Sequence, residues 1–350
     1  MKKYMLNEFN ELKNKENLTI LAIESSCDET AVSVVRNGRE VLSNVVASQI
    51  EIHRRFGGVV PEIASRNHLM AISNLYEQAL KSAGIKAEEL DAIAVTYGAG
   101  LVGALLVGIN FAKGLSYALK KPLIAINHVH GHIASNYISH PDLKPPFLCL
   151  MVSGGHTALL KITDYNKFKL LGTTVDDAVG EAFDKVARVL GLPYPGGPEI
   201  DKLAKEGKNN IKFTVSNSLH ATLNFSFSGI KTSVINYVHK FDQKKEDFCK
   251  ADVARSFEEA VTDELVEKSI RAMRLTGMKK VVIAGGVGAN SMLKSKMSKK
   301  CKEKGFEAYF PVLKYCTDNA AMIGSAAYYY IRSGIGLAPL DLTARPSIDL

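Results

Sequence analysis

Residues 18–36 have the sequence LTILAIESSCDETAVSVVR, in which an apolar run, a polar turn and a second apolar run follow one another. Both runs have the apolar and β-branched composition of buried strands, so we expect two strands joined by a short polar turn. Asn37-Gly38 then predicts a hairpin turn into a third strand over residues 40–47. This strand–turn–strand start decides the fold class, because the chain contains it twice.

The rest of the first half alternates helices and strands. Pro61 occupies a favourable first helical position and predicts a helix over 62–83 that ends at Gly84. A strand over 91–96 leads through a glycine turn into a helix from about Leu101 to Leu119. Strands that alternate with helices in this way indicate parallel pairing and an α/β fold.

The second start lies at residues 147–162, FLCLMVSGGHTALLKI, just after a proline-rich boundary at 141–146. Helices follow, then a strand over 280–284, a glycine turn and a final helix from residue 320. The repeat is one of pattern and not of letters. It predicts a duplicated α/β fold of two lobes with a central cleft.

We expect three parts along the chain. Residues 1–17 are polar and of mixed charge, lack the apolar core of a signal peptide, and are expected to be a mobile or loosely packed extension. The first lobe is expected over 18–145, with the final helix, 320–335, returning to it, and the second lobe over 146–319.

The composition is that of a globular protein, with 46% hydrophobic and 23% charged residues. A net charge of +8 favours an anionic partner such as nucleic acid. The five cysteines are odd in number and form no C-x-x-C pair, which indicates reduced thiols in a cytoplasmic protein. We expect no membrane span, because the longest apolar candidate, 100–119, contains Asn110 and Lys113.

Two histidines form the strongest candidate for a metal site. His128 and His132 follow an apolar strand and share one face of the next predicted helix, while His130 is expected to point elsewhere. Such a pair either binds a transition metal or is simply polar surface. Asp318 is either the N-cap of the final helix or the third ligand that two histidines need.

Glycine turns are the candidates for anion binding. Residues 153–156, SGGH, form either a tight hairpin or a place where a phosphate meets backbone N–H groups. The turn 285–290 follows a strand and opens a helix, which suits a nucleotide. The six lysines within 294–304 are either a solvated helix face or a contact for RNA phosphates.

Ten segments together resemble one family, the universal tRNA adenosine threonylcarbamoyltransferases, formerly known as O-sialoglycoprotein endopeptidases. The resemblance runs in order from about Leu18 to the last helix and leaves out only the extension. The segments are 23–30 (IESSCDET), 57–62 (GGVVPE), 100–108 (GLVGALLVG), 128–132 (HVHGH), 152–157 (VSGGHT), 180–185 (GEAFDK), 194–198 (YPGGP), 225–232 (FSFSGIKT), 285–290 (GGVGAN) and 316–319 (CTDN).

The resemblance implies an actin-like, Hsp70-like and sugar-kinase-like ATPase fold. It implies transfer of a threonylcarbamoyl group from threonylcarbamoyl-AMP to N6 of adenosine 37, in tRNAs that read codons beginning with A. Its bacterial members act with a smaller paralogous actin-like subunit and a P-loop ATPase subunit. Four departures from the family's usual residues remove no implied ligand and no glycine; they are Ala99, Asn127, His130 and Met151.

The same resemblance implies the site residues. The metal ligands are His128, His132 and Asp318, and the metal is usually iron, Fe²⁺, with Zn²⁺ as the alternative ion. The adenylate contacts are Met151, Val152, Ser153, Gly154, Gly155, Asp184, Gly197, Asp201 and Asn290.

Reasoning from the chemistry adds a base and leaves two rivals. Asp28 and Glu29, in the first polar turn, are candidates for a general base or an orienting carboxylate. A metalloprotease of the H-E-x-x-H class is disfavoured because Val129 occupies the position of the catalytic glutamate. A non-catalytic nucleotide-binding scaffold is the second alternative.

Overall fold

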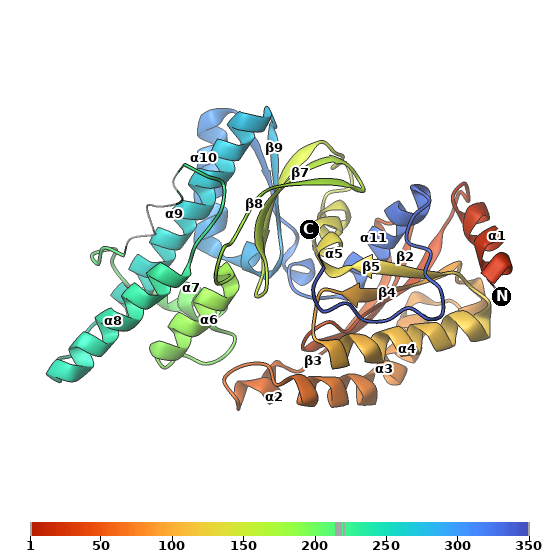
Figure 1. Ribbon diagram of the computed structural model, residues 1–350, viewed down its shortest axis with the longest axis horizontal. Helices are drawn as coiled ribbons and strands as arrows, with labels where there is room; N and C mark the ends of the chain where they lie inside the picture. The colour runs from red at the N-terminus through yellow and green to blue at the C-terminus, as the bar shows by residue number, and fades with distance from the viewer. Residues whose placement is uncertain (1, 214–218, 220, 349–350) are drawn as a thin grey trace. The chain divides into compact units, whose positions relative to one another are not determined.

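The computed structural model describes residues 2–213, 219 and 221–348 and divides into two compact units (Figure 1). The first unit comprises Met1–Lys144 and Pro311–Leu350, and the second comprises Pro145–Phe310. Residues 311–319, which the sequence pattern placed in the second lobe, therefore belong to the first unit. The second unit is one continuous segment, and the first is made from the two segments that flank it.

The first unit is built on a five-stranded sheet with the strand order β3-β2-β1-β4-β5. The first three strands pair antiparallel through hairpins, whereas β1, β4 and β5 are parallel. The carboxyl ends of the three parallel strands therefore meet at one edge of the sheet. The strands are β1 (Thr19–Glu24), β2 (Glu29–Arg36), β3 (Glu40–Ser48), β4 (Ala92–Gly98) and β5 (Leu123–Asn127).

Helices cover both faces of this sheet. Leu21 and Ile23 of β1 pack with α3 (Pro61–Ala83) and α4 (Val102–Leu119). Ala22 points the other way, toward α11 (Ala320–Arg332), which packs in turn on α5 (His128–Ser139). Successive side chains of this buried strand point to opposite faces of the sheet and therefore pack against two different layers of helices.

Helix α4 corrects one expectation. By length and composition it is apolar enough to cross a membrane, although no such span was expected. Its Ala104, Leu105, Ile109 and Ala112 are buried, and Leu105, Ile109 and Ala112 belong to the core of the first unit. These buried residues form the face of the helix that packs on the sheet.

The second unit repeats the topology with a sheet of order β10-β9-β6-β7-β8. Again three strands pair antiparallel and two further strands add in parallel. The duplication predicted from the sequence pattern is confirmed at the level of strand order. The strands are β6 (Phe147–Val152), β7 (Thr157–Asp164), β8 (Lys167–Thr173), β9 (Lys280–Ala284) and β10 (Glu307–Tyr309).

The helices of the second unit supply one large apolar core with the sheet. Phe183 and Phe257 meet edge to face within it, with ring centroids 5.1 Å apart. The helices are α6 (Val179–Val189), α7 (Gly196–Ala204), α8 (Ser228–Lys244), α9 (Lys250–Thr276) and α10 (Ser291–Lys304).

The N-terminal extension is not loosely packed. It forms α1 (Lys2–Leu12), and its Met5, Phe9 and Leu12 are buried. Helix α1 contacts α11, and Arg332 of α11 donates to the carbonyl oxygens of Lys13 and Lys15. A second short helix that the sequence did not predict, α2 (Ile50–Arg54), precedes the Gly57-Gly58 loop.

Candidate functional site

The histidine pair is set by the way α5 begins. Strand β5 ends at Asn127, whose side chain accepts a hydrogen bond from Val129 N at 2.9 Å and caps the helix. The helix therefore begins at His128, and His128 and His132 lie on one face with ring centroids 4.6 Å apart. His130 points elsewhere, as expected, and its Nδ1 lies 2.5 Å from the Tyr330 hydroxyl.

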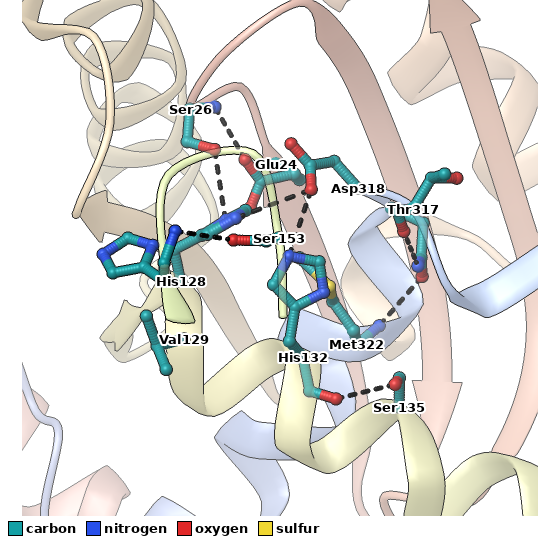
Figure 2. Close-up of polar contacts among 12 residues, drawn as sticks. Glu24, Ser26, His128, Val129, His132, Ser135, Ser153, Thr317, Asp318 and Met322 are labelled. Carbon is teal, nitrogen blue, oxygen red and sulfur yellow. Dashed lines mark hydrogen bonds and ion pairs between the residues drawn. The ribbon is translucent and has the colours of Figure 1, made fainter. Parts of the chain in front are cut away.

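Asp318 completes a cluster with the two histidines inside the first unit. Its Oδ1 lies 3.5 Å from His128 Nε2 and 3.2 Å from His132 Nε2. Figure 2 shows one oxygen of the carboxylate facing a nitrogen of each ring. The N-cap of α11 is Asn319, which accepts from Met322 N, so the capping role considered for Asp318 is filled by its neighbour.

The cluster has the properties of a metal site. One ligand atom from each of the three residues lies within 4.8 Å of the others. Both ring nitrogens of His132 are buried without a hydrogen-bond partner among the described residues, although Nε2 faces Asp318. A buried imidazole nitrogen without such a partner is costly unless it binds an ion. Two imidazoles and a carboxylate suit a divalent transition metal.

Glu24, the last residue of β1, lies directly behind His128 and is fully buried. Its carboxylate accepts from Ser26 N at 2.6 Å and from Thr96 Oγ1 at 2.5 Å, and lies 3.2 Å from His128 Nδ1. Burial lowers the pKa of His128, but the carboxylates of Asp318 and Glu24 outweigh it and raise that pKa to about 9. The sequence motifs did not single out Glu24 as a site residue.

Asp28 and Glu29 lie where the first polar turn enters β2, also in the first unit. Burial raises the pKa of both, and that of Glu29 reaches about 8 although the Ser48 hydroxyl opposes the shift. Glu29 Oε1 accepts from Ser48 Oγ at 2.9 Å, while Oε2 is buried without a hydrogen-bond partner among the described residues. A carboxyl group with this pKa can exchange a proton near neutral pH.

His68 of α3 holds this turn from behind. Its Nδ1 lies 2.7 Å from Thr30 Oγ1 and its Nε2 lies 2.9 Å from the carbonyl oxygen of Cys27. These two contacts bracket Asp28 and Glu29 along the chain. His68 was not predicted, and its only sequence signal is a histidine on the otherwise apolar face of an amphipathic helix.

In the second unit, the SGGH turn joins the buried residues Met151 and Val152 of β6 to β7. Ser153 N donates to the carbonyl oxygen of His156 at 2.8 Å, which closes the turn. A Cβ added at Gly154 or Gly155 would meet nothing within 4 Å, so both glycines border open space. Their absent side chains leave the backbone N–H groups accessible.

The other residues implied as adenylate contacts also lie in the second unit, and two of them are carboxylates that bond to a neighbouring helix start. Asp184 accepts from Gly196 N at 2.7 Å and so fixes the turn that contains Gly197. Asp201 accepts from Ser291 N at 3.0 Å and from its hydroxyl at 2.6 Å. Each carboxylate therefore already orders a helix start beside the glycine turns.

Asn290 uses both ends of its side-chain amide. Its oxygen accepts from Leu293 N at 2.8 Å, and its NH₂ group donates to Glu258 Oε1 at 2.5 Å. Glu258 is buried in α9, and burial raises its pKa to about 7. The sequence did not identify Glu258, because a glutamate in a long helix is usually a solvent-facing residue.

A family model described as tRNA N6-adenosine threonylcarbamoyltransferase matches residues 40–325. The chain belongs to this family. It is therefore a transferase, and the family resemblance drawn from the motifs is confirmed.

Curated relatives agree over nearly the whole length. The tRNA N6-adenosine threonylcarbamoyltransferase of Clostridium perfringens (strain ATCC 13124) is 55% identical over 332 residues, which cover 95% of this chain and 98% of the relative. That of Clostridium botulinum (strain Kyoto / Type A2) is 55% identical over 337 residues, with 96% and 99% covered.

Solved structures of distant sequence share the fold. Full-length HypF matches with a TM-score of 0.60 at 16% identity, over 90% of this chain and 46% of HypF. Component A of the Acidaminococcus fermentans (R)-2-hydroxyglutaryl-CoA dehydratase matches with a TM-score of 0.53 at 14% identity, over 91% and 99%. These likenesses confirm the duplicated, actin-like α/β fold and carry no conclusion about the reaction.

Proposed function

We propose that this member of the family transfers the threonylcarbamoyl group from threonylcarbamoyl-AMP to N6 of adenosine 37, in tRNAs that read codons beginning with A. The observation that carries the proposal is the convergence of His128, His132 and Asp318 on one point in a chain of this family. The net charge of +8 suits a polyanionic substrate such as tRNA.

The chemistry explains why the acyl donor is an adenylate. The exocyclic amine of adenine is a weak nucleophile because its lone pair is delocalised into the ring. The carbamoyl carbon must therefore be activated, as it is in a mixed anhydride with AMP. The N6–carbon bond forms, the bond from that carbon to the phosphate oxygen breaks, AMP leaves, and N6 loses one proton.

The second unit is proposed to bind the adenylate. Met151, Val152, Ser153, Gly154 and Gly155 are the proposed contacts at the phosphate. Gly154 and Gly155 would present their backbone N–H groups to it, which the open space beside the two glycines supports. Asp184, Gly197, Asp201 and Asn290 would hold the adenosine part. Their existing hydrogen bonds keep them in place before the ligand arrives, which lowers the entropic cost of binding.

The first unit is proposed to hold one divalent metal through His128, His132 and Asp318. We propose iron, Fe²⁺, with Zn²⁺ as the alternative ion, since two imidazoles and a carboxylate suit both. When bound, the ion supplies a Lewis acid that can orient and polarise the threonylcarbamoyl group.

The proton from N6 needs an acceptor, and Glu29 is our proposal, with Asp28 as an orienting carboxylate. The raised pKa of Glu29, about 8, makes its carboxylate a stronger base than an ordinary glutamate. Its buried Oε2, which has no hydrogen-bond partner in the part of the chain that the structure describes, is the atom that would take the proton.

We further propose a cytoplasmic enzyme that works with a smaller paralogous actin-like subunit and a P-loop ATPase subunit. The resemblance to bacterial members supports these partners, and the absence of any C-x-x-C pair among its five cysteines fits a reducing compartment. The two rival functions are not favoured. A protease of the H-E-x-x-H class needs a glutamate where this chain has Val129. A non-catalytic scaffold would not need the metal ligands, and His128, His132 and Asp318 are all present.

The test is a transfer assay with purified protein, unmodified tRNA and threonylcarbamoyl-AMP, with and without the partner subunits and a chelator. Mass spectrometry of the tRNA nucleosides should find N6-threonylcarbamoyladenosine and its loss on chelation. The proposal is wrong if no modified adenosine forms under any partner condition. Casein digestion abolished by His132→Ala would favour the protease instead.

A further inference from the structure

Glu24 is a fully buried carboxylate that none of the proposed steps uses. Its three contacts join three elements of the first unit: the turn after β1 through Ser26, β4 through Thr96, and α5 through His128. A buried carboxylate is costly and is retained only when it is hydrogen-bonded. An apolar residue would fill the space without this cost, so the carboxylate itself needs an explanation.

The two oxygens of Glu24 have different partners, and Figure 2 shows the contact with Ser26. Oε1 accepts from Ser26 N, and Oε2 accepts from the Thr96 hydroxyl. Oε2 also lies 3.2 Å from His128 Nδ1. An ionised carboxylate can only accept, so His128 Nδ1 is the donor in this contact. The Ser26 hydroxyl lies 3.1 Å from the same nitrogen and is a second acceptor for its proton.

The opposite nitrogen of the ring faces the metal-ligand cluster. His128 Nε2 lies 3.5 Å from Asp318 Oδ1. An imidazole that donates from Nδ1 offers its lone pair at Nε2, and a metal-ligating histidine needs this tautomer and this ring orientation.

We propose that Glu24 is a positioning residue of the metal site, which holds His128 in the ring orientation and tautomer that present Nε2 to a divalent metal. The inference rests on the proposed metal function of His128, His132 and Asp318. It adds a fourth residue that does not touch the ion.

Glu24→Gln separates the proposal from simple space filling, because glutamine has the same shape with one acceptor end and one donor end. If the oxygen of the glutamine side chain faces His128, the NH₂ group of the same side chain faces the Ser26 N–H, so that two donors oppose each other. If its NH₂ group faces His128, Nδ1 must become the acceptor. The proton then moves to Nε2, the nitrogen that the metal needs.

The experiment measures Fe²⁺ affinity under anaerobic conditions, and Zn²⁺ affinity separately, by competition with a chelating dye on the full chain. Glu24→Gln should weaken binding about 10- to 100-fold, the usual cost of losing such a partner. Glu24→Asp keeps the charge but withdraws the carboxylate from Nδ1, so it should also weaken binding and serves if the glutamine variant folds poorly. The unfolding temperature of each metal-free variant shows whether it is folded.

Thr96→Val is the matched control, because it removes a hydrogen bond to the same oxygen but leaves the contact with His128. It should lower the unfolding temperature and retain the metal affinity. If a folded Glu24 variant binds metal as wild type does, or if Thr96→Val loses as much affinity as Glu24→Gln, the role of Glu24 is refuted. If His132→Ala leaves wild-type affinity unchanged, the proposed metal site itself is wrong, and the inference falls with it.

Discussion

Glu29 is the residue at which the proposed acid–base chemistry can be tested directly. As a base it must be ionised to act, and its pKa lies at about 8. The transfer rate should therefore rise with pH through about 8. Glu29→Gln should lower the rate by about 10²- to 10⁴-fold and flatten the profile, because a general base typically contributes that much.

Ser48 provides a control with a predicted sign. Its hydroxyl stabilises the ionised carboxylate of Glu29, so Ser48→Ala should raise the pKa of Glu29 further and move the rising limb to higher pH. Single-turnover transfer rates measured from about pH 6 to about pH 10 would resolve both effects. A full wild-type rate for Glu29→Gln would exclude the residue as the base.

Glu258 makes a second pH prediction, on stability. Its pKa is raised from 4.5 to about 7, so the folded state binds its proton more tightly than the unfolded state does. The stabilisation it gives is complete below pH 4.5 and is lost as the pH rises through about 7. Glu258→Gln imitates the protonated form and should gain stability relative to wild type as the pH rises across this window.

Urea denaturation of both proteins at about pH 5 and about pH 8 would measure this difference, whose slope is at most about 1.4 kcal/mol per pH unit for one group. Asp201 and Arg255 also act on Glu258, and the first raises its pKa while the second lowers it. Parallel stabilities of wild type and Glu258→Gln at both pH values would contradict the shifted pKa.

At the scale of elements, α1 shows what local patterns leave out. Met5, Phe9 and Leu12 have helical spacing, but the segment carries no capping signal and is mostly polar. Its partner, α11, lies at the other end of the chain, so only tertiary structure gives the helix a surface to pack on.

Phe9→Ala tests whether α1 is part of the first unit's structure. Phe9 is 2% exposed, and removing a buried phenylalanine costs about 3–5 kcal/mol where the site cannot relax. A terminal helix can undock, so we expect a loss of about 1–3 kcal/mol in urea denaturation. Leu6→Ala, on the same helix but 49% exposed, is the control and should change little.

The sequence predicted some residues of the candidate site and not others, and the reason is physical in each case. His128 and His132 are four residues apart on one helix, so local spacing alone places them on the same face. Asp318 belongs to a distant segment, and spacing could not choose between a cap and a ligand; only the family motif favoured the ligand. Glu24 and Glu258 escaped notice because their burial comes from tertiary packing, which composition does not record.

At the scale of the whole molecule, one of the two units is continuous in sequence and the other is not. The second unit is continuous, Pro145–Phe310, and has its own sheet and apolar core. The first unit needs residues from both ends of the chain, because α11 packs on β1 and β2. Gly324 of α11 approaches Ala22 and Val35 so closely that an added Cβ would lie 2.7 Å from Val35.

This arrangement predicts how fragments behave. Residues 145–310 expressed alone should unfold in a single cooperative transition, because their core is complete. Residues 1–144 alone should fail to fold, since the sheet face that α11 covers would be exposed to water. Joining 1–144 to 311–350 through a flexible Gly/Ser linker should restore a folded unit. Circular dichroism during urea titration of the three fragments would test this prediction. A cooperative transition of 1–144 alone would show that α11 is dispensable. If 145–310 showed no cooperative transition, the second unit would depend on the first.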